Sequence, residues 1–182
     1  FSYYKINNVK KNSIEFFNAL DLNEKEQFYE LMEELSNNND FFSILSSLEL
    51  VKVHLLNSDY ELALNLYKKI LNNKKLEQLY ISAIAASAAY NFIDIQYNNK
   101  SLNFLSEIEN FINLINDNLE NYKDSKLELK YLLTVVRIDL NNLSYSNDIE
   151  AIDLHNEIMD TDNISSVIKE RVNKIHEFQL YN

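Results

Sequence analysis

The sequence predicts an all-α fold, an α-solenoid of antiparallel helix hairpins with about eight or nine helices. The first observation is that its 182 residues include no glycine and no proline, where an average composition would supply roughly twenty. These two residues break helices, and the tight turns of β-rich folds rely on them. The second observation is that apolar residues recur at helical spacing through most of the chain, without sustained strand-like alternation. Asparagine-rich segments separate these stretches, so we expect helices joined by asparagine corners.

The periodic stretches define the expected helices in chain order. Residues 1–22 carry weak periodicity and are expected to form a juxtamembrane or linker helix, followed by a capping helix at 24–36. Three hairpins and a closing helix come next, at 41–56 with 59–72, 76–97 with 101–119, 125–142 with 147–160, and 164–180. A spacing of about 35 to 45 residues per hairpin is typical of an α-solenoid. No linker-like segment splits residues 23–182, which we expect to be one helical repeat domain.

Polar residues mark the expected helix ends. Four segments resemble capping boxes, in which a side-chain oxygen accepts from a free backbone N–H: Asn23-x-x-Glu26, Ser58-x-x-Glu61, Ser125-x-x-Glu128 and Asn147-x-x-Glu150. The expected carboxyl ends fall on asparagines, at 37–39, 57, 72–73, 98–99 and 141–142. Asparagine is the best substitute for glycine in the left-handed conformation that follows many helices. Each cap should contribute about 1 kcal/mol.

Composition excludes several classes of function. The net charge is −11, whereas nucleic-acid binding needs a basic surface, so we expect no direct contact between this segment and DNA or RNA. The absence of cysteine rules out disulfides, thiolate zinc sites and thiol nucleophiles. The sequence contains no run of about 20 apolar residues, the length that a membrane-spanning helix needs. The most apolar stretch, Tyr80 to Ile95, is expected to be a buried helix.

The first residues leave two interpretations open. Phe1, Tyr3 and Tyr4 precede Lys5, and aromatic and basic residues collect at membrane interfaces. A membrane anchor upstream of Phe1 is therefore one expectation, and a frayed chain end is the other.

Candidate chemistry is sparse. His54, His155 and His176 lie far apart, and none has a second histidine four residues away, so we expect packed imidazoles rather than metal ligands. Residues 160–163 begin like a calcium loop but lack the glycine and glutamate that such a loop needs. We therefore expect no catalytic, metal-binding or cofactor-binding residues. Four tyrosines outside the apolar stripes are candidate exposed contact residues: Tyr3, Tyr4, Tyr145 and Tyr181.

Residues 58–71 resemble the second helix of a tetratricopeptide repeat. The resemblance gives structural roles to four side chains, Tyr60, Ala63, Tyr67 and Ile70. It implies that Ala63 lets two helices approach closely and that Tyr67 fills the space between repeats. A weaker copy at the same spacing comprises Ala151, His155 and Ile158. The chain departs from the motif at three places, with Val51 in place of glycine, Ser47 in place of tryptophan and Lys75 in place of proline.

A narrower likeness covers Leu22 to Ile93, where an acidic helix, the segment 41–52, the 59–72 helix and an alanine-rich helix follow in order. This order resembles the tetratricopeptide-like ancillary subunit of the bacterial Sec translocon and its relatives. The resemblance implies a membrane anchor followed by a periplasmic helical domain that acts as a chaperone or scaffold. Lys5, Lys10 and Lys11 depart from the pattern, because they would lie on the wrong side for the positive-inside rule.

These observations favour a non-enzymatic protein-interaction scaffold or chaperone of the bacterial envelope. We expect a right-handed stack whose concave face, lined by the first helix of each hairpin, binds a peptide or protein segment. Two alternatives stay open: the peptide-sensing domain of a cytoplasmic transcription regulator, and an enzyme hidden in a helical fold. Homo-oligomerisation also stays open. Fractionation of the full-length protein in its host separates the two settings, since membrane attachment outside the cytoplasm favours the scaffold and a soluble cytoplasmic protein favours the regulator.

Overall fold

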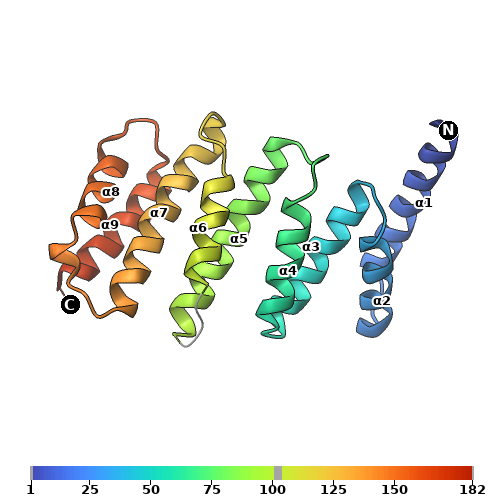
Figure 1. Ribbon diagram of the computed structural model, residues 1–182, viewed down its shortest axis with the longest axis horizontal. Helices are drawn as coiled ribbons and strands as arrows, with labels where there is room; N and C mark the ends of the chain where they lie inside the picture. Colours follow the sequence, from blue (N-terminus) through green and yellow to red (C-terminus); the bar gives the residue numbers. More distant parts are fainter. Residues whose placement is uncertain (1, 101–103, 182) are drawn as a thin grey trace. The chain divides into compact units, whose positions relative to one another are not determined.

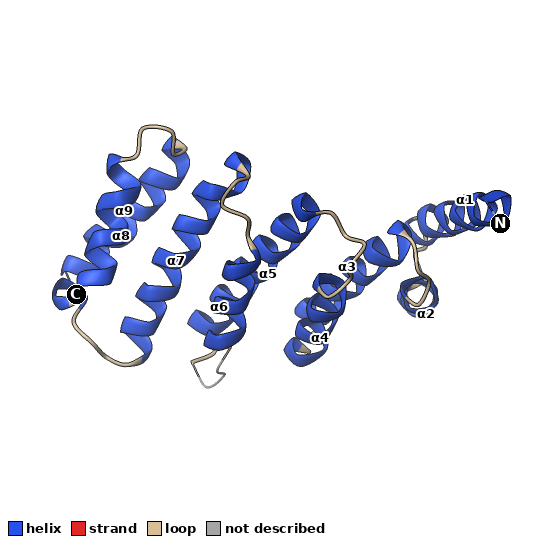
Figure 2. Ribbon diagram, turned by 45° about the horizontal axis from the view of Figure 1, so that its top comes forward, coloured by secondary structure: helices blue, strands red, loops and turns tan. Residues whose placement is uncertain are grey.

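The computed structural model is helical throughout and confirms the all-α class (Figures 1 and 2). It describes residues 2–100 and 104–181, and within those ranges it contains nine α-helices, one short 3₁₀ helix and no strand. The helices are α1 (Ser2–Leu20), α2 (Lys25–Ser36), α3 (Phe41–Leu56), α4 (Tyr60–Leu71), α5 (Gln78–Asn98), α6 (Leu105–Leu114), α7 (Glu120–Leu140), η1 (Tyr145–Asn147), α8 (Ile149–Asp160) and α9 (Ser166–Tyr181). The chain divides into two compact units, Phe1–Lys74 and Lys75–Asn182.

The first unit is formed by α1 to α4. Helix α3 packs against both α4 and α2, and α1 packs against α2 and α3. The buried core that joins them contains Phe16, Ala19, Met32, Leu35 and Leu50. Residues of the expected linker helix, Phe16 and Ala19, therefore lie inside the core of this unit.

The second unit is formed by α5 to α9. Helix α5 packs against α6 and α7, α7 packs against α8 and α9, and α8 packs against α9. The alanine-rich middle of α5 is almost completely buried. Its Phe92 packs against the rings of Phe104 and Phe111, with ring centroids 4.9 and 6.1 Å apart. A second core lies between α7, α8 and α9 and includes Tyr131, Ile158 and Val172.

The expected carboxyl ends of the helices are confirmed, but among these asparagines the expected left-handed conformation is found only at Asn142. Asn37, Asn57, Asn72, Asn99 and Asn141 each directly follow a helix. Among the described residues, only Ser58 and Asn142 have positive φ, at 64° and 52°. Two of the asparagines instead close the helix with their side chains, because the amides of Asn37 and Asn141 donate to the carbonyls of Glu33 and Arg137. Asparagine therefore ends these helices as a hydrogen-bond donor more than as a substitute for glycine.

The four expected capping boxes are wrong. Helices α2, α4 and α8 start one residue later than the boxes predict, after Glu24, Asp59 and Asp148, and α7 starts at Glu120, well before Ser125. Ser58 adopts the left-handed conformation that ends the preceding helix, so it cannot cap the next one. Side-chain caps are instead formed by aspartates, since Asp40 accepts from the N–H of Ser43 and Asp148 from the N–H of Ala151.

The cap at Asp148 gives a first prediction. Asp148→Ala should lower the free energy of unfolding by about 1 kcal/mol, because the N–H of Ala151 loses the 2.8 Å bond to the carboxylate. Asp153→Ala, on the exposed part of the same helix, should cost no more than about 0.5 kcal/mol. Urea unfolding followed by circular dichroism measures both values, and equal losses would show that the cap is not formed in solution.

Candidate binding groove

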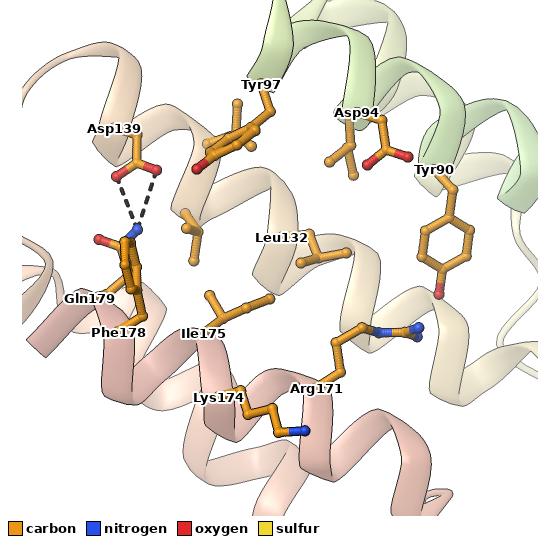
Figure 3. A pocket seen from close by; sticks show the side chains of 13 residues that line it. Tyr90, Asp94, Tyr97, Leu132, Asp139, Arg171, Lys174, Ile175, Phe178 and Gln179 are labelled. Atoms are coloured by element: carbon orange, nitrogen blue, oxygen red, sulfur yellow. Dashed lines mark hydrogen bonds between the residues drawn. The ribbon is translucent and has the colours of Figure 1, made fainter.

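The main candidate site is a groove of about 470 Å³ between α5, α7 and α9 (Figure 3). Its volume lies within the range of natural ligand pockets, about 300–1,000 Å³. Side chains from all three helices line it: Tyr90, Ile93, Asp94, Tyr97, Leu132, Val135, Val136, Asp139, Arg171, Lys174, Ile175, Phe178 and Gln179. The helical period places these side chains on one face of each helix, at intervals of three or four residues.

The groove has an apolar floor and aromatic walls. Leu132, Val135 and Val136 of α7 form part of the apolar lining. The rings of Tyr97 on α5 and Phe178 on α9 remain 51% and 60% exposed. Exposed apolar surface of this kind, gathered around a concavity, marks a site for a partner more often than scattered surface residues do.

One end of the groove is held by an ion pair whose carboxylate is fully buried. The carboxylate of Glu128, fully buried one turn before Leu132, accepts hydrogen bonds from both Nε and Nη2 of Arg171. The hydroxyl of Tyr90 donates to the same carboxylate at 2.6 Å. Figure 3 shows the guanidinium near the hydroxyl of Tyr90. Burial and the nearby carboxylate raise the pKa of Tyr90, while the hydrogen bond to Glu128 raises the pKa of Arg171.

The other end is polar and carries an acidic side chain. Both carboxylate oxygens of Asp139 accept from the Nε2 atom of Gln179, at 3.1 and 3.2 Å, as the dashed lines in Figure 3 mark. Asp94 lies between Tyr90 and Tyr97 on α5, and burial raises the pKa of its carboxyl group. The groove therefore combines an apolar middle with hydrogen-bonding groups at its ends, an arrangement suited to binding.

A second polar cluster lies beside the groove, between α7, η1, α8 and α9. The imidazoles of His155 and His176 are stacked, with centroids 3.7 Å apart and planes 13° apart. Nδ1 of His176 lies 2.8 Å from the hydroxyl of Tyr145, which lies 2.9 Å from the hydroxyl of Tyr131. Burial lowers the pKa of His176, and His155 lowers it further.

None of the residues singled out by the repeat resemblance is among those that line the groove. On α4, Ala63, Tyr67 and Ile70 are buried and Tyr60 is half-buried. On α8, Ala151, His155 and Ile158 are buried. Across the described part of the chain, no group of three or more histidine, aspartate or glutamate side chains is arranged to hold a metal ion.

One expectation about the tyrosines is wrong. Tyr145 is only 3% exposed, because the turn η1 inserts its ring between Tyr131 and His176. Tyr181 is 90% exposed, as expected. The side chains of Tyr3 and Tyr4 lie outside those that the structure describes.

Sequence reasoning missed the groove itself. The spacing Ser125-x-x-Glu128 predicts a capping box, whereas Glu128 is the buried partner of Arg171. One signal was available: the 17 basic residues include only two arginines, Arg137 and Arg171. In a lysine-rich chain, an arginine favours a site that needs bidentate geometry.

Comparison of the chain with family models, with curated proteins and with solved structures finds no match. None of the helices in the described ranges is both long and apolar enough to cross a membrane.

Proposed function

We propose that the chain is a non-enzymatic protein-interaction scaffold, an α-solenoid of tetratricopeptide-like hairpins that binds a peptide or protein segment. The contacts within the second unit support this proposal. Helices α5 and α6 pack together, as do α7 and α8, while α5 also contacts α7 and α7 contacts α9. The groove is lined by α5, α7 and α9, which are the first helix of each hairpin and the closing helix. In the proposed solenoid, these helices would line the concave face that binds a partner.

The observation that carries the proposal is the apolar floor flanked by two exposed aromatic rings. Tyr97 and Phe178 each keep about half of their surface in contact with water. Covering a large apolar side chain contributes about 1.5–3 kcal/mol when its whole surface is buried, so each half-exposed ring offers roughly 1 kcal/mol. A partner that inserts apolar side chains between the rings gains this contribution along with that of the floor.

The polar rim favours a peptide over a purely apolar ligand. Lys174 and Gln179 of α9 carry side-chain N–H donors, which also bond Glu170 and Asp139, and Asp94 of α5 provides a carboxylate acceptor. An extended peptide carries both an N–H and a C=O at almost every residue, and these groups match such a rim. Apolar anchor residues in the middle of the groove, with backbone hydrogen bonds at its edge, are the expected binding mode.

A display experiment tests the proposal. Selection of random 12-residue peptides on the immobilised full chain should enrich sequences that carry aromatic or large aliphatic residues. The enriched peptides should bind Tyr97→Ala/Phe178→Ala at least about tenfold more weakly than the unchanged chain, because the variant loses both walls of the groove. Fluorescence anisotropy with labelled peptides gives the dissociation constants.

The matched control is Tyr181→Ala, which removes a more exposed aromatic ring from the same α9 helix but outside the groove. Its affinity for the selected peptides should be unchanged. Equal affinities for the groove variant and the control would contradict the proposal, as would a selection that enriches no peptide.

A further inference from the structure

We propose that the histidine pair, His155 of α8 and His176 of α9, is an acid-sensitive latch that holds α9 in place and releases the groove when the pair is protonated. The effect on the groove rests on the proposed function. The release of α9 does not, because it follows from contacts within the second unit.

The stacking of the pair requires at least one neutral ring. The two imidazoles face each other at 3.7 Å, almost parallel, and His155 is only 9% exposed. Neutral rings pack at this distance, whereas two imidazolium rings would place like charges face to face in a site with little water to screen them. Protonation of both rings therefore opposes the contact between α8 and α9.

The hydrogen-bond chain beside the pair favours neutral His176. The arrangement that gives both buried tyrosine hydroxyls an acceptor is the one in which Tyr131 donates to Tyr145. The hydroxyl of Tyr145 is then free to donate to Nδ1 of His176, which accepts only when that nitrogen is unprotonated.

Protonation of His176 forces this chain to reverse. An imidazolium donates from both nitrogens, so Tyr145 would have to accept from Nδ1 and turn its own hydrogen toward Tyr131. The hydroxyl of Tyr131 would then lose the acceptor that it uses now, in a side chain with no exposed surface. A buried donor without an acceptor is destabilising.

The charged groups around the pair do not cancel the preference for neutral His176. On α9, Glu177 follows His176 and raises its pKa, but its carboxylate is also bonded to Asn173 at 2.9 Å. Asn173 in turn faces Nε2 of His155 at 3.4 Å. Asp148, at the start of α8, acts on Tyr145. Helix α7 contributes the neutral Tyr131 to the cluster, so burial and the second imidazole prevail and the pKa of His176 is lowered.

The lowered pKa of His176 determines how stability changes with pH. The pKa of His176 is about 6.5 in the unfolded chain and lower in the folded chain, so the unfolded chain binds more protons between these two values. Stability is therefore complete above about pH 6.5, falls as the pH decreases below it, and stops falling below the folded pKa.

The latch is connected to the groove through one helix. His176 directly follows Ile175, and the same α9 helix supplies Arg171 and Phe178 to the groove. When α9 separates from α8 and η1, one wall of the groove is displaced. Peptide affinity should then fall together with the protection of α9.

The test is native-state hydrogen exchange of the full chain at pH 7.5 and 5.5. Protection factors of α9 amides, corrected for the intrinsic exchange rate at each pH, should fall at the lower pH, by at most about tenfold. The melting temperature should fall as well, by at most about 5 °C. His155→Gln/His176→Gln retains hydrogen-bonding side chains without titrating, so its protection factors should be the same at both pH values. His54→Gln, in the first unit, should keep the wild-type pH dependence.

Equal protection of α9 at the two pH values in the unchanged chain would overturn the proposal. So would a pH dependence of α9 protection in the double variant as large as that of the unchanged chain. If the double variant does not fold, His176→Gln alone replaces it. The change in α9 protection between the two pH values must then be smaller in His176→Gln than in His54→Gln. Affinity for the selected 12-residue peptides is measured at the same two pH values. Loss of α9 protection without any peptide binding would contradict the proposed function but support the latch, whereas pH-independent binding and protection would contradict the latch alone.

Discussion

Arg171→Ala is expected to lower the free energy of unfolding by about 3 kcal/mol, because it leaves the fully buried carboxylate of Glu128 without its cation. Only the hydroxyl of Tyr90 would remain from the hydrogen bonds described above. Half of the arginine side chain is exposed, which places the cost at the lower end of the range for breaking buried pairs. Urea unfolding of the full chain measures the loss.

The other arginine provides the control. Arg137 forms an ion pair with Glu109 at 2.9 Å, but both side chains are substantially exposed. Arg137→Ala should therefore cost less than about 1 kcal/mol. Similar losses for the two arginine variants would show that Glu128 is solvated and that the pair at the groove is incidental.

A double substitution separates the cost of an orphaned charge from the cost of losing a contact. Glu128→Leu/Arg171→Met removes both charges and keeps apolar volume, and such replacements of buried pairs are often neutral or stabilising. The double variant should therefore be more stable than Arg171→Ala. The pair also positions Arg171 at the end of the groove. A stable double variant with weakened peptide binding would therefore assign the Glu128–Arg171 pair a positioning role.

Phe92→Ala is the second large effect and should cost about 3–5 kcal/mol, the usual range for truncating a fully buried phenylalanine. Its ring has no exposed surface and contacts Phe104 and Phe111, so the substitution opens a cavity where α5 meets α6. Thermal or urea unfolding of the full chain gives the value.

Tyr97→Ala, five residues later on the same helix, is the comparison. Tyr97 is half-exposed in the groove, so its loss should change stability by no more than about 0.5 kcal/mol while weakening peptide binding. Comparable destabilisation by the two substitutions would contradict this arrangement, in which α5 presents Phe92 to the core and Tyr97 to the groove.

The fold could be predicted largely from local information. Helical periodicity and the absence of helix-breaking residues place most of the helices, and asparagine marks their carboxyl ends at Asn37, Asn57 and Asn72. The amino-terminal caps were misplaced because serine, asparagine and aspartate cap equally well, and only the backbone conformation of Ser58 shows that Asp59 precedes the helix. The arrangement of the hairpins as a solenoid remains a prediction.

The candidate site could not be predicted in the same way, because its members are far apart in the sequence. Glu128 lies 38 residues from Tyr90 and 43 from Arg171. Each side chain taken alone resembles a solvated surface residue, and Glu128 has the spacing of a capping box. His155 and His176 are likewise unremarkable until α8 and α9 stack them. Long-range pairing of this kind depends on the tertiary packing, which the helical period does not encode.

The most direct measurement of peptide binding in the groove is site-specific photocrosslinking. Benzoylphenylalanine placed at Phe178 keeps an aromatic ring in the wall of the groove, and the same group at Tyr181 lies on the same helix outside it. A peptide selected on the unchanged chain should crosslink from position 178, and excess unlabelled peptide should suppress the product. Crosslinking from position 181 but not from 178, or from neither, would contradict the proposal that this groove binds peptides.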